Sequence, residues 1–153
     1  MQDLSLHILD IVENSIRAGA GRVEIRLTED EENDVLTVSI RDDGKGMDPQ
    51  TLRRAADPFF TAKPGRRFGL GLAMFRQATR EADGSFEISS TPEAGTSITA
   101  TFRLSHPDRK PFGDMAATLE TLVAANPGVQ FGYEYKAGTE VIGFDTRELN
   151  GHE

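Results

Sequence analysis

Two short segments in which apolar and polar residues alternate constrain the fold of this chain most strongly. Apolar residues occupy every second position in residues 23–27 and again in residues 36–40. This period of two places one face of an extended chain against a core and leaves the other face polar. The segment between them, residues 29–34, contains only acidic residues and one asparagine, and we expect it to be an exposed turn. The pattern therefore predicts two half-buried strands joined by a polar turn.

Helical patterns lie on both sides of these strands. Apolar residues recur at helical spacing in residues 3–18, Asp48-Pro49 starts a second helix, and residues 69–82 form a third that glycines open. Two more strands are expected at 85–90 and 97–104. The order helix, strand, strand, helix, helix, strand, strand predicts an α+β fold, a two-layer α/β sandwich with helices on one face of a mixed sheet.

Residues 105–153 follow a linker that contains two prolines, residues 105–113. A helix is expected at 114–125, and a β-hairpin is expected around Lys136-Ala137-Gly138. The first hairpin strand carries an aromatic stripe, for which we favour packing against the 114–125 helix. The alternative is a docking surface for a partner protein or a second subunit. The stripe consists of Val129, Phe131, Tyr133 and Tyr135.

Composition excludes several classes of protein. The chain has 153 residues and no cysteine, which removes disulfides, thiolate catalysis and cysteine metal sites. Its three histidines are widely spaced, so we do not expect a histidine metal cluster. Its net charge of −8 makes binding to nucleic acid or to an anionic membrane surface unfavourable. No apolar run approaches the length of a membrane span and no signal peptide is evident, so we expect a cytoplasmic protein.

The stretch DDGKGM at residues 42–47 follows the second strand. Its glycines permit a tight turn and let a flat ligand approach the backbone. A carboxylate at the strand end can accept a hydrogen bond from an exocyclic amine such as that of adenine. The alternative is an ordinary turn, in which Asp-Gly is common, and the stretch alone favours that alternative.

Four residues, Gly69, Leu70, Gly71 and Leu72, open the 69–82 helix. The N–H groups and the dipole at a helix N-terminus attract anions, and glycine lets a phosphate come close. The pattern is neither a P-loop nor a dinucleotide fingerprint, because no Gly-Lys-Ser/Thr follows and the third glycine is missing. A glycine-rich helix start that serves packing alone is the alternative.

The first helix carries an acid and an amide one turn apart, Asp10 and Asn14, so both lie on one helix face. The Asn14 oxygen can ligate Mg²⁺, a hard cation that keeps waters and bridges phosphates. Asp10 can orient or deprotonate an attacking water or hydroxyl. For a lone acid–amide pair, a solvated helix face is the better interpretation.

Two weaker signals concern phosphate. Gly95-Thr96 offers a hydroxyl and a backbone N–H, although it is also an ordinary hairpin turn. Lys63, Arg66 and Arg67 cluster in the expected loop 57–68 and either meet phosphates or form a solvated basic loop.

Taken in this order and on these elements, the motifs resemble the GHKL family of ATP-binding domains, which includes gyrase, the heat-shock chaperone, histidine kinases and MutL. IVENSIRAGA is similar to the N box, DDGKGM to the first glycine box, DPFFTAK to the F box of histidine kinases, FGLGLAM to the second glycine box, and GTSITATF to the last box. The resemblance covers about residues 4–104. It implies a GHKL ATP-binding sandwich at 1–104, with 105–153 as a small C-terminal helix–hairpin extension.

The same resemblance implies an Mg²⁺–ATP site. Asn14 is implied as the metal ligand and Asp42 as the acceptor for the adenine amine. Residues 57–68 are implied to form a short lid that is mobile until nucleotide arrives. The remaining residues implied or expected to bind the nucleotide are Arg17, Gly44, Gly46, Met47, Lys63, Gly69, Leu70, Gly71, Leu72 and Thr96.

Three positions bear on the chemistry. Arg67 stands where the family usually has glycine, two residues before Gly69, so its side chain either stiffens the lid or supplies a cation. Asp10 stands where hydrolytic members and the anti-sigma serine kinases have a glutamate base, and it is one methylene shorter. Arg17 is the residue type that histidine kinases often have, whereas MutL and the chaperone have aspartate.

These features leave three functions open. Only a few residues precede the first helix, and His7 lacks the surrounding pattern of a phosphoacceptor, so we do not expect a complete autophosphorylating kinase. We favour a kinase-like subunit that transfers the γ-phosphate to a separate protein partner. The alternatives are a slow ATPase that acts as a conformational switch and a non-catalytic ATP-sensing subunit of a larger complex. A homodimer is a further option.

Overall fold

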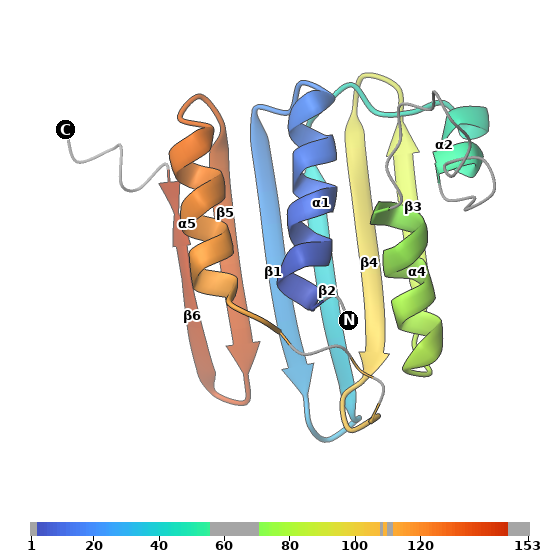
Figure 1. Ribbon diagram of the computed structural model, residues 1–153, viewed down its shortest axis with the longest axis vertical. Coiled ribbons are helices and arrows are strands. Elements are labelled where there is room, and N and C mark those ends of the chain that lie inside the picture. The colour runs from blue at the N-terminus through green and yellow to red at the C-terminus, as the bar shows by residue number, and fades with distance from the viewer. Residues whose placement is uncertain (1–2, 56–70, 108, 110–111, 147–153) are drawn as a thin grey trace.

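The computed structural model describes residues 3–55, 71–107, 109 and 112–146 and consists of one sheet with helices on one of its faces (Figure 1). The six described strands have the order β3-β4-β2-β1-β5-β6. The helices are α1 (Leu4–Arg17), α2 (Pro49–Ala55), α4 (Gly71–Glu81) and α5 (Met115–Ala125). The strands are β1 (Arg22–Asp30), β2 (Val35–Asp42), β3 (Phe86–Thr91), β4 (Gly95–Arg103), β5 (Gln130–Ala137) and β6 (Glu140–Asp145). The predicted two-layer α+β sandwich is confirmed.

The sheet is mixed because one strand pair is parallel. β1 and β2 form an antiparallel pair joined by the acidic turn, and β3 and β4 form a second antiparallel pair. β1 pairs with β5 in parallel, and the chain reaches β5 from β4 through α5, which crosses over the sheet. β5 and β6 form an antiparallel pair, so the expected C-terminal hairpin is present and extends the same sheet. The division of the chain at residue 104 stays a prediction.

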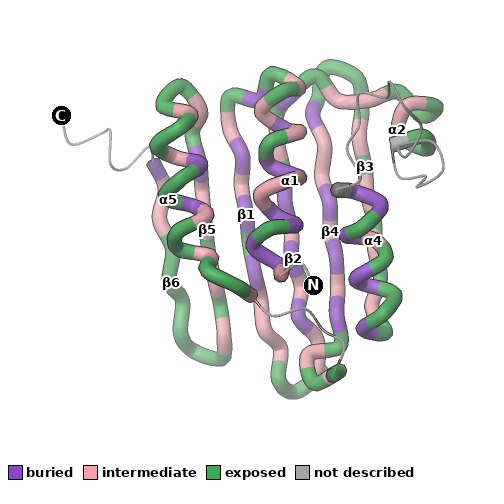
Figure 2. The backbone as a smooth tube through the Cα atoms, viewed as in Figure 1, coloured by how far each residue is buried: buried purple, intermediate pink, exposed green. Residues whose placement is uncertain are grey.

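One face of the sheet carries the core, and α1, α4 and α5 lie side by side over it (Figure 1). In β1 and β2 the burial alternates as the sequence pattern predicts, and in Figure 2 the buried positions recur along these strands and on the helices. Phe75, Phe102 and Phe131 are among the largest fully buried side chains. Burial of each contributes roughly 1.5–3 kcal/mol to stability.

The aromatic stripe of β5 belongs to this core. Phe131 is buried together with Leu119 and Leu122 of α5, and Tyr133 and Tyr135 are half-buried against the same cluster. Packing beneath the 114–125 helix, the favoured interpretation of the stripe, is confirmed for Phe131, whereas the tyrosine rings contact Phe144 and Phe112.

The first helix is held at both ends. Asp3 caps its N-terminus, where the carboxylate accepts a hydrogen bond from the backbone N–H of Leu6 at 3.0 Å. After Arg17 the chain turns through Gly19, which has a φ of +83°. Among the described helices, none has both the length and the hydropathy needed to cross a membrane.

Candidate functional site

A row of three polar side chains crosses the helix-covered face of the sheet at one end. Asp42 on β2 lies directly opposite Thr96 on β4, and Thr96 lies directly opposite Ser90 on β3. The neighbouring row two residues further along the strands is entirely apolar and consists of Ile40, Ile98 and Ile88. A polar row at the edge of an apolar face marks where the core ends and where a ligand can find hydrogen-bonding partners.

The Asp42 carboxylate is fixed from two directions. Its Oδ2 accepts a hydrogen bond from the Ser15 hydroxyl of α1 at 2.6 Å, and its Oδ1 accepts one from the Gly44 backbone N–H at 2.9 Å. The residue is half-buried. Because each carboxylate oxygen has two lone pairs, the group keeps acceptor capacity for a ligand amine. Its predicted role in recognising adenine stays a prediction.

The loop after Asp42 is held against α1 on one side and against the β3–β4 turn on the other. The Lys45 N–H donates to the Ala18 carbonyl at 3.0 Å, and the Lys45 carbonyl accepts from the Glu93 N–H at 2.7 Å. The Met47 N–H donates to the Ser90 hydroxyl oxygen at 2.8 Å. Met47 itself packs against the core, next to the polar row.

Two glycines in this region are required by geometry. Gly46 has a φ of +68°, and a Cβ at this position would overlap the backbone carbonyl oxygen of Thr91. Gly95 has a φ of +96°, and a Cβ there would overlap the backbone carbonyl oxygen of Asp42. Both glycines therefore allow backbones to approach more closely than any other residue would permit.

The metal-ligand candidate Asn14 lies next to Ser15 near the end of α1 and is half-buried. Its Oδ1 accepts a hydrogen bond from Nη1 of the exposed Arg17 at 2.8 Å. Asp10, the candidate base, lies one turn earlier on the same helix and is also half-buried. The structure thus brings Asn14 and Arg17 into contact. The residue after Asn14, Ser15, forms a hydrogen bond with Asp42.

The second glycine box is only partly described. α4 begins at Gly71, and the side chain of Leu72 is buried. The expected lid at 57–68, which includes Lys63, lies outside the described residues, and so do Gly69 and Leu70. Their assigned roles stay predictions.

Three residues at this end of the sheet were missed in the sequence. Ser15 contacts Asp42, and Ser90 contacts Thr96. Asp43 accepts hydrogen bonds from the backbone N–H groups of Gly21 and Arg22 at 2.8 and 2.9 Å. Ser90 had a detectable signal, because it continues the inward positions of Phe86 and Ile88 with a polar side chain. Ser15 had one as well, since it adjoins Asn14 and follows Ile11 by four residues, on the apolar face of the helix.

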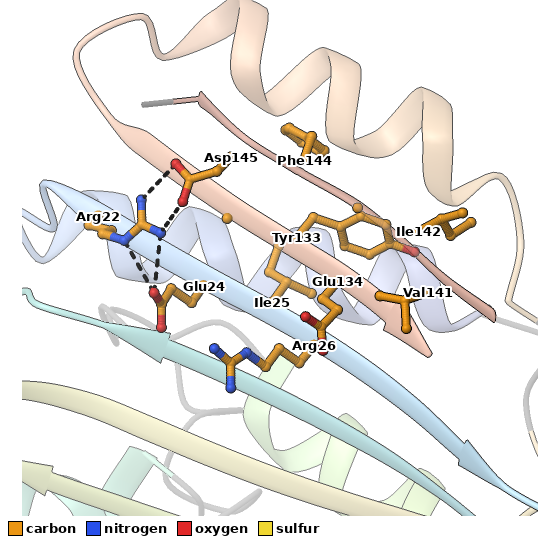
Figure 3. Close-up of a pocket in the computed structure, with 12 residues that line it drawn as sticks. Arg22, Glu24, Ile25, Arg26, Tyr133, Glu134, Val141, Ile142, Phe144 and Asp145 are labelled. Carbon is orange, nitrogen blue, oxygen red and sulfur yellow. Dashed lines mark hydrogen bonds and ion pairs between the residues drawn. The ribbon is translucent and has the colours of Figure 1, made fainter. Parts of the chain in front are cut away.

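A separate groove of about 390 Å³ lies over β1, β5 and β6 (Figure 3). Its polar lining comes from outward-pointing residues of these strands, and Arg22 crosses it to reach Asp145 at 2.8 Å and Glu24 at 3.2 Å. Gly132 lies beneath this arginine, where a Cβ would come within 2.8 Å of Nη2. The groove is on the face opposite the polar row, so it belongs to a different surface.

The described part of the chain is thus a mixed sheet covered by helices on one face, with a carboxylate, a hydroxyl and a glycine loop at one end, and comparison with known proteins shows its family. A family model described as "Histidine kinase-, DNA gyrase B-, and HSP90-like ATPase" matches residues 2–106. The chain belongs to this family, and the resemblance inferred from the motifs is confirmed.

The chain is also similar to individual members. It is 35% identical over 106 residues to the sensor histidine kinase YxdK of Bacillus subtilis, covering 65% of this chain and 32% of the kinase. It is 33% identical over 119 residues to the non-motile and phage-resistance protein of Caulobacter vibrioides, covering 72% of this chain and 14% of that protein. The chain therefore spans about a third or less of the length of these relatives.

A solved structure has the same fold. The ATPase domain of Aquifex aeolicus MutL, complexed with ADP, matches with a TM-score of 0.57 over 93% of this chain and 64% of that chain. The sequence identity is 14%, so this likeness shows the fold alone.

Proposed function

We propose that the protein binds Mg²⁺–ATP at the polar row and acts as a kinase-like signalling subunit that transfers the γ-phosphate to a separate protein. The observation that carries the proposal is the Asp42 carboxylate, which is anchored by Ser15 and Gly44 beside the Thr96 hydroxyl. The family relationship and the similarity to sensor histidine kinases support both the nucleotide and the kinase assignment.

In this proposal each part of the site has one task. Asp42 accepts the adenine amine, Gly44 and Gly46 let the base approach the backbone, and Met47 and Thr96 line the adenine pocket. The N-terminus of α4 at Gly71 and Leu72 faces the phosphates, which its N–H groups and dipole stabilise. Residues proposed to add phosphate contacts are Arg17, Lys63, Gly69 and Leu70.

The donor chemistry of α1 fits a magnesium ion that is shared with phosphates. Asn14 offers one neutral amide oxygen, and Mg²⁺ in nucleotide sites commonly takes one or two protein ligands plus phosphate oxygens and water. Arg17 donates to that same oxygen at 2.8 Å, and the oxygen has a second lone pair. When bound, the ion supplies neutralisation of phosphate charge.

Asp10 is proposed as the general base. It would accept the proton of the attacking atom, which is a hydroxyl oxygen or an imidazole nitrogen of a partner in the kinase case and a water oxygen in the ATPase case. Asn14 on the next turn would lie beside the same phosphate. The rest of the site contributes by positioning and by charge stabilisation, which dominate phosphoryl transfer.

A slow ATPase switch is the second candidate, because the N box of this chain is similar to that of MutL and Asp10 is a carboxylate. A non-catalytic ATP sensor is the third, and it follows if the short Asp10 side chain fails to reach the attacking atom. In either case the partner protein would respond to nucleotide binding.

A single assay with γ-labelled ATP separates the three. Purified wild-type protein and Asp10→Asn are incubated with Mg²⁺ and a lysate of the source cells, and both released phosphate and labelled protein are followed. Label on one protein that is lost in the variant supports the kinase. Phosphate release that is lost in the variant supports the ATPase, and tight ATP binding with neither signal supports the sensor. No ATP binding by the wild type contradicts all three.

A further inference from the structure

Ser90 joins three parts of the site through one hydroxyl group. Its oxygen accepts the Met47 backbone N–H at 2.8 Å, lies 2.8 Å from the Thr96 hydroxyl and lies 3.2 Å from the Gly95 carbonyl. The side chain is half-buried and occupies the inward face of β3, at the end of the polar row. It therefore touches the glycine loop and both residues that begin β4.

One of these contacts has a fixed direction, and in the Ser90–Thr96 pair either hydroxyl can be the donor. A backbone N–H can only donate, so Ser90 accepts from Met47 and keeps one hydrogen to give. The nearer of its two acceptors is the Thr96 oxygen, at 2.8 Å against 3.2 Å for the Gly95 carbonyl. Once Ser90 donates to Thr96, the hydrogen of Thr96 is left for a ligand.

We propose that Ser90 is a positioning residue that makes the Thr96 hydroxyl a hydrogen-bond donor beside the Asp42 acceptor. Thr96 and Asp42 are direct cross-strand neighbours on the same face, which brings their Cβ atoms to about 4.5–5.5 Å. The site then presents an acceptor and a donor side by side.

This order of groups selects the edge of one purine. Adenine offers an amine donor next to the ring acceptor N1, which complements Asp42 and Thr96. Guanine offers a carbonyl acceptor next to an N1–H donor, which places acceptor against acceptor and donor against donor. Ser90 thus contributes to adenine specificity without touching the base. The inference rests on the proposed function, since it requires an adenine nucleotide in this site.

The test compares binding of ATP with that of 1-deaza-ATP, in which C–H replaces the ring nitrogen N1. The wild type is expected to prefer ATP by about 3- to 10-fold, the value of one hydrogen bond. Ser90→Ala is expected to lose most of this preference by weakening ATP binding alone, and Ser90→Thr, which restores a hydroxyl, is expected to regain it. In a Thr96→Val background, Ser90→Ala is expected to produce no further loss of preference.

Ser89→Ala is the matched control, because Ser89 is the neighbouring serine and points to the other face of β3, where it is exposed. It is expected to keep the wild-type preference. An equal loss of affinity for both nucleotides in Ser90→Ala, or an unchanged preference, overturns the role of Ser90 and leaves the ATP site in place. Failure of the wild type to bind either nucleotide overturns the proposed function and the role of Ser90 with it.

Discussion

The Ser15 hydroxyl donates a 2.6 Å hydrogen bond to Oδ2 of Asp42 and so connects the last turn of α1 to the end of β2. Asp42→Asn is expected to lower ATP affinity by about 10- to 150-fold, because a bond to a charged acceptor is worth about 1.5–3 kcal/mol. An amide donor that faces the adenine amine would add to this loss. The fold should survive, since Ser15 can turn its hydrogen to the Ile11 carbonyl at 3.3 Å. Titration with ATP measures the effect.

Asp43 provides the control for this substitution. Its carboxylate accepts the N–H groups of Gly21 and Arg22 and is exposed, so Asp43→Ala should lower the melting temperature without a selective effect on ATP. Undiminished ATP affinity in Asp42→Asn would contradict the adenine assignment.

Asn14 and Arg17 are expected to separate metal binding from phosphate binding. Asn14→Ala should remove the Mg²⁺ dependence of ATP affinity, because it deletes the proposed ligand oxygen. Arg17→Ala deletes the cation that donates to that oxygen at 2.8 Å, so it should weaken ATP binding while the dependence on Mg²⁺ remains. ATP titrations with Mg²⁺ and with EDTA distinguish the two variants. Equal Mg²⁺ sensitivity in Asn14→Ala and the wild type would exclude Asn14 as a ligand.

Most of the fold could be predicted from periodicity, because the strands have one buried face and the helices one apolar stripe. The alternation in residues 23–27 and 36–40 predicts β1 and β2. The residues Gly69–Leu72 predict the start of a helix, and α4 begins at Gly71. The pairing of β5 with β1 could not be predicted this way, because the register of a parallel pair depends on how a distant crossover helix packs.

The candidate site was predictable where a motif has fixed chain spacing, as with Asn14 and the DDGKGM loop. The contacts of Ser15 with Asp42 and of Ser90 with Met47 were not predictable, since these residues are 27 and 43 positions apart in the chain. Such pairs form only when strand register and helix rotation are both set, and neither can be read from one segment alone.

Gly95 is expected to be among the least replaceable residues of the site. Gly95→Ala combines a φ of +96° with an overlap between the new Cβ and the Asp42 carbonyl, so β4 must move away from β2. The expected loss of stability is at least about 2 kcal/mol, more than an αL conformation alone costs an alanine. Gly138 has a φ of +62° with nothing within 4 Å of its would-be Cβ, and Gly138→Ala is expected to cost about 1 kcal/mol. Urea unfolding of both variants measures the difference, and equal losses would contradict the close approach at Gly95.

Arg22 is expected to hold the C-terminal hairpin to the rest of the sheet. It pairs with Asp145 of β6 at 2.8 Å across Gly132 of β5, and both charged side chains are about four-fifths buried, with exposed fractions of 18% and 20%. Asp145→Asn should therefore weaken the hairpin by about 1 kcal/mol. Gly132→Ala should have a similar effect by displacing the arginine.

The measurement is hydrogen exchange of the backbone amides. In both variants the β6 amides should exchange faster than in the wild type, and the exchange rates in β2 should be unchanged. Gly128→Ala is the control, because nothing lies within 4 Å of its would-be Cβ. Faster exchange throughout the sheet would mean that Arg22 stabilises the whole fold and not the hairpin.

Tyr135 is expected to make the stability of the protein depend on pH in alkaline solution. Burial of the phenol, and its 2.6 Å hydrogen bond to Glu29, raise the pKa of Tyr135 from 10.0 to about 12. A raised pKa favours the protonated phenol in the folded state, so its contribution is complete below pH 10 and is lost as the pH rises through 12. Tyr135→Phe lacks this group, and the difference in unfolding free energy between it and the wild type should shrink over that interval. Tyr133→Phe is the comparison, because burial alone raises the pKa of Tyr133. A difference that stays constant from pH 9 to 12 would show that folding does not raise the pKa of Tyr135.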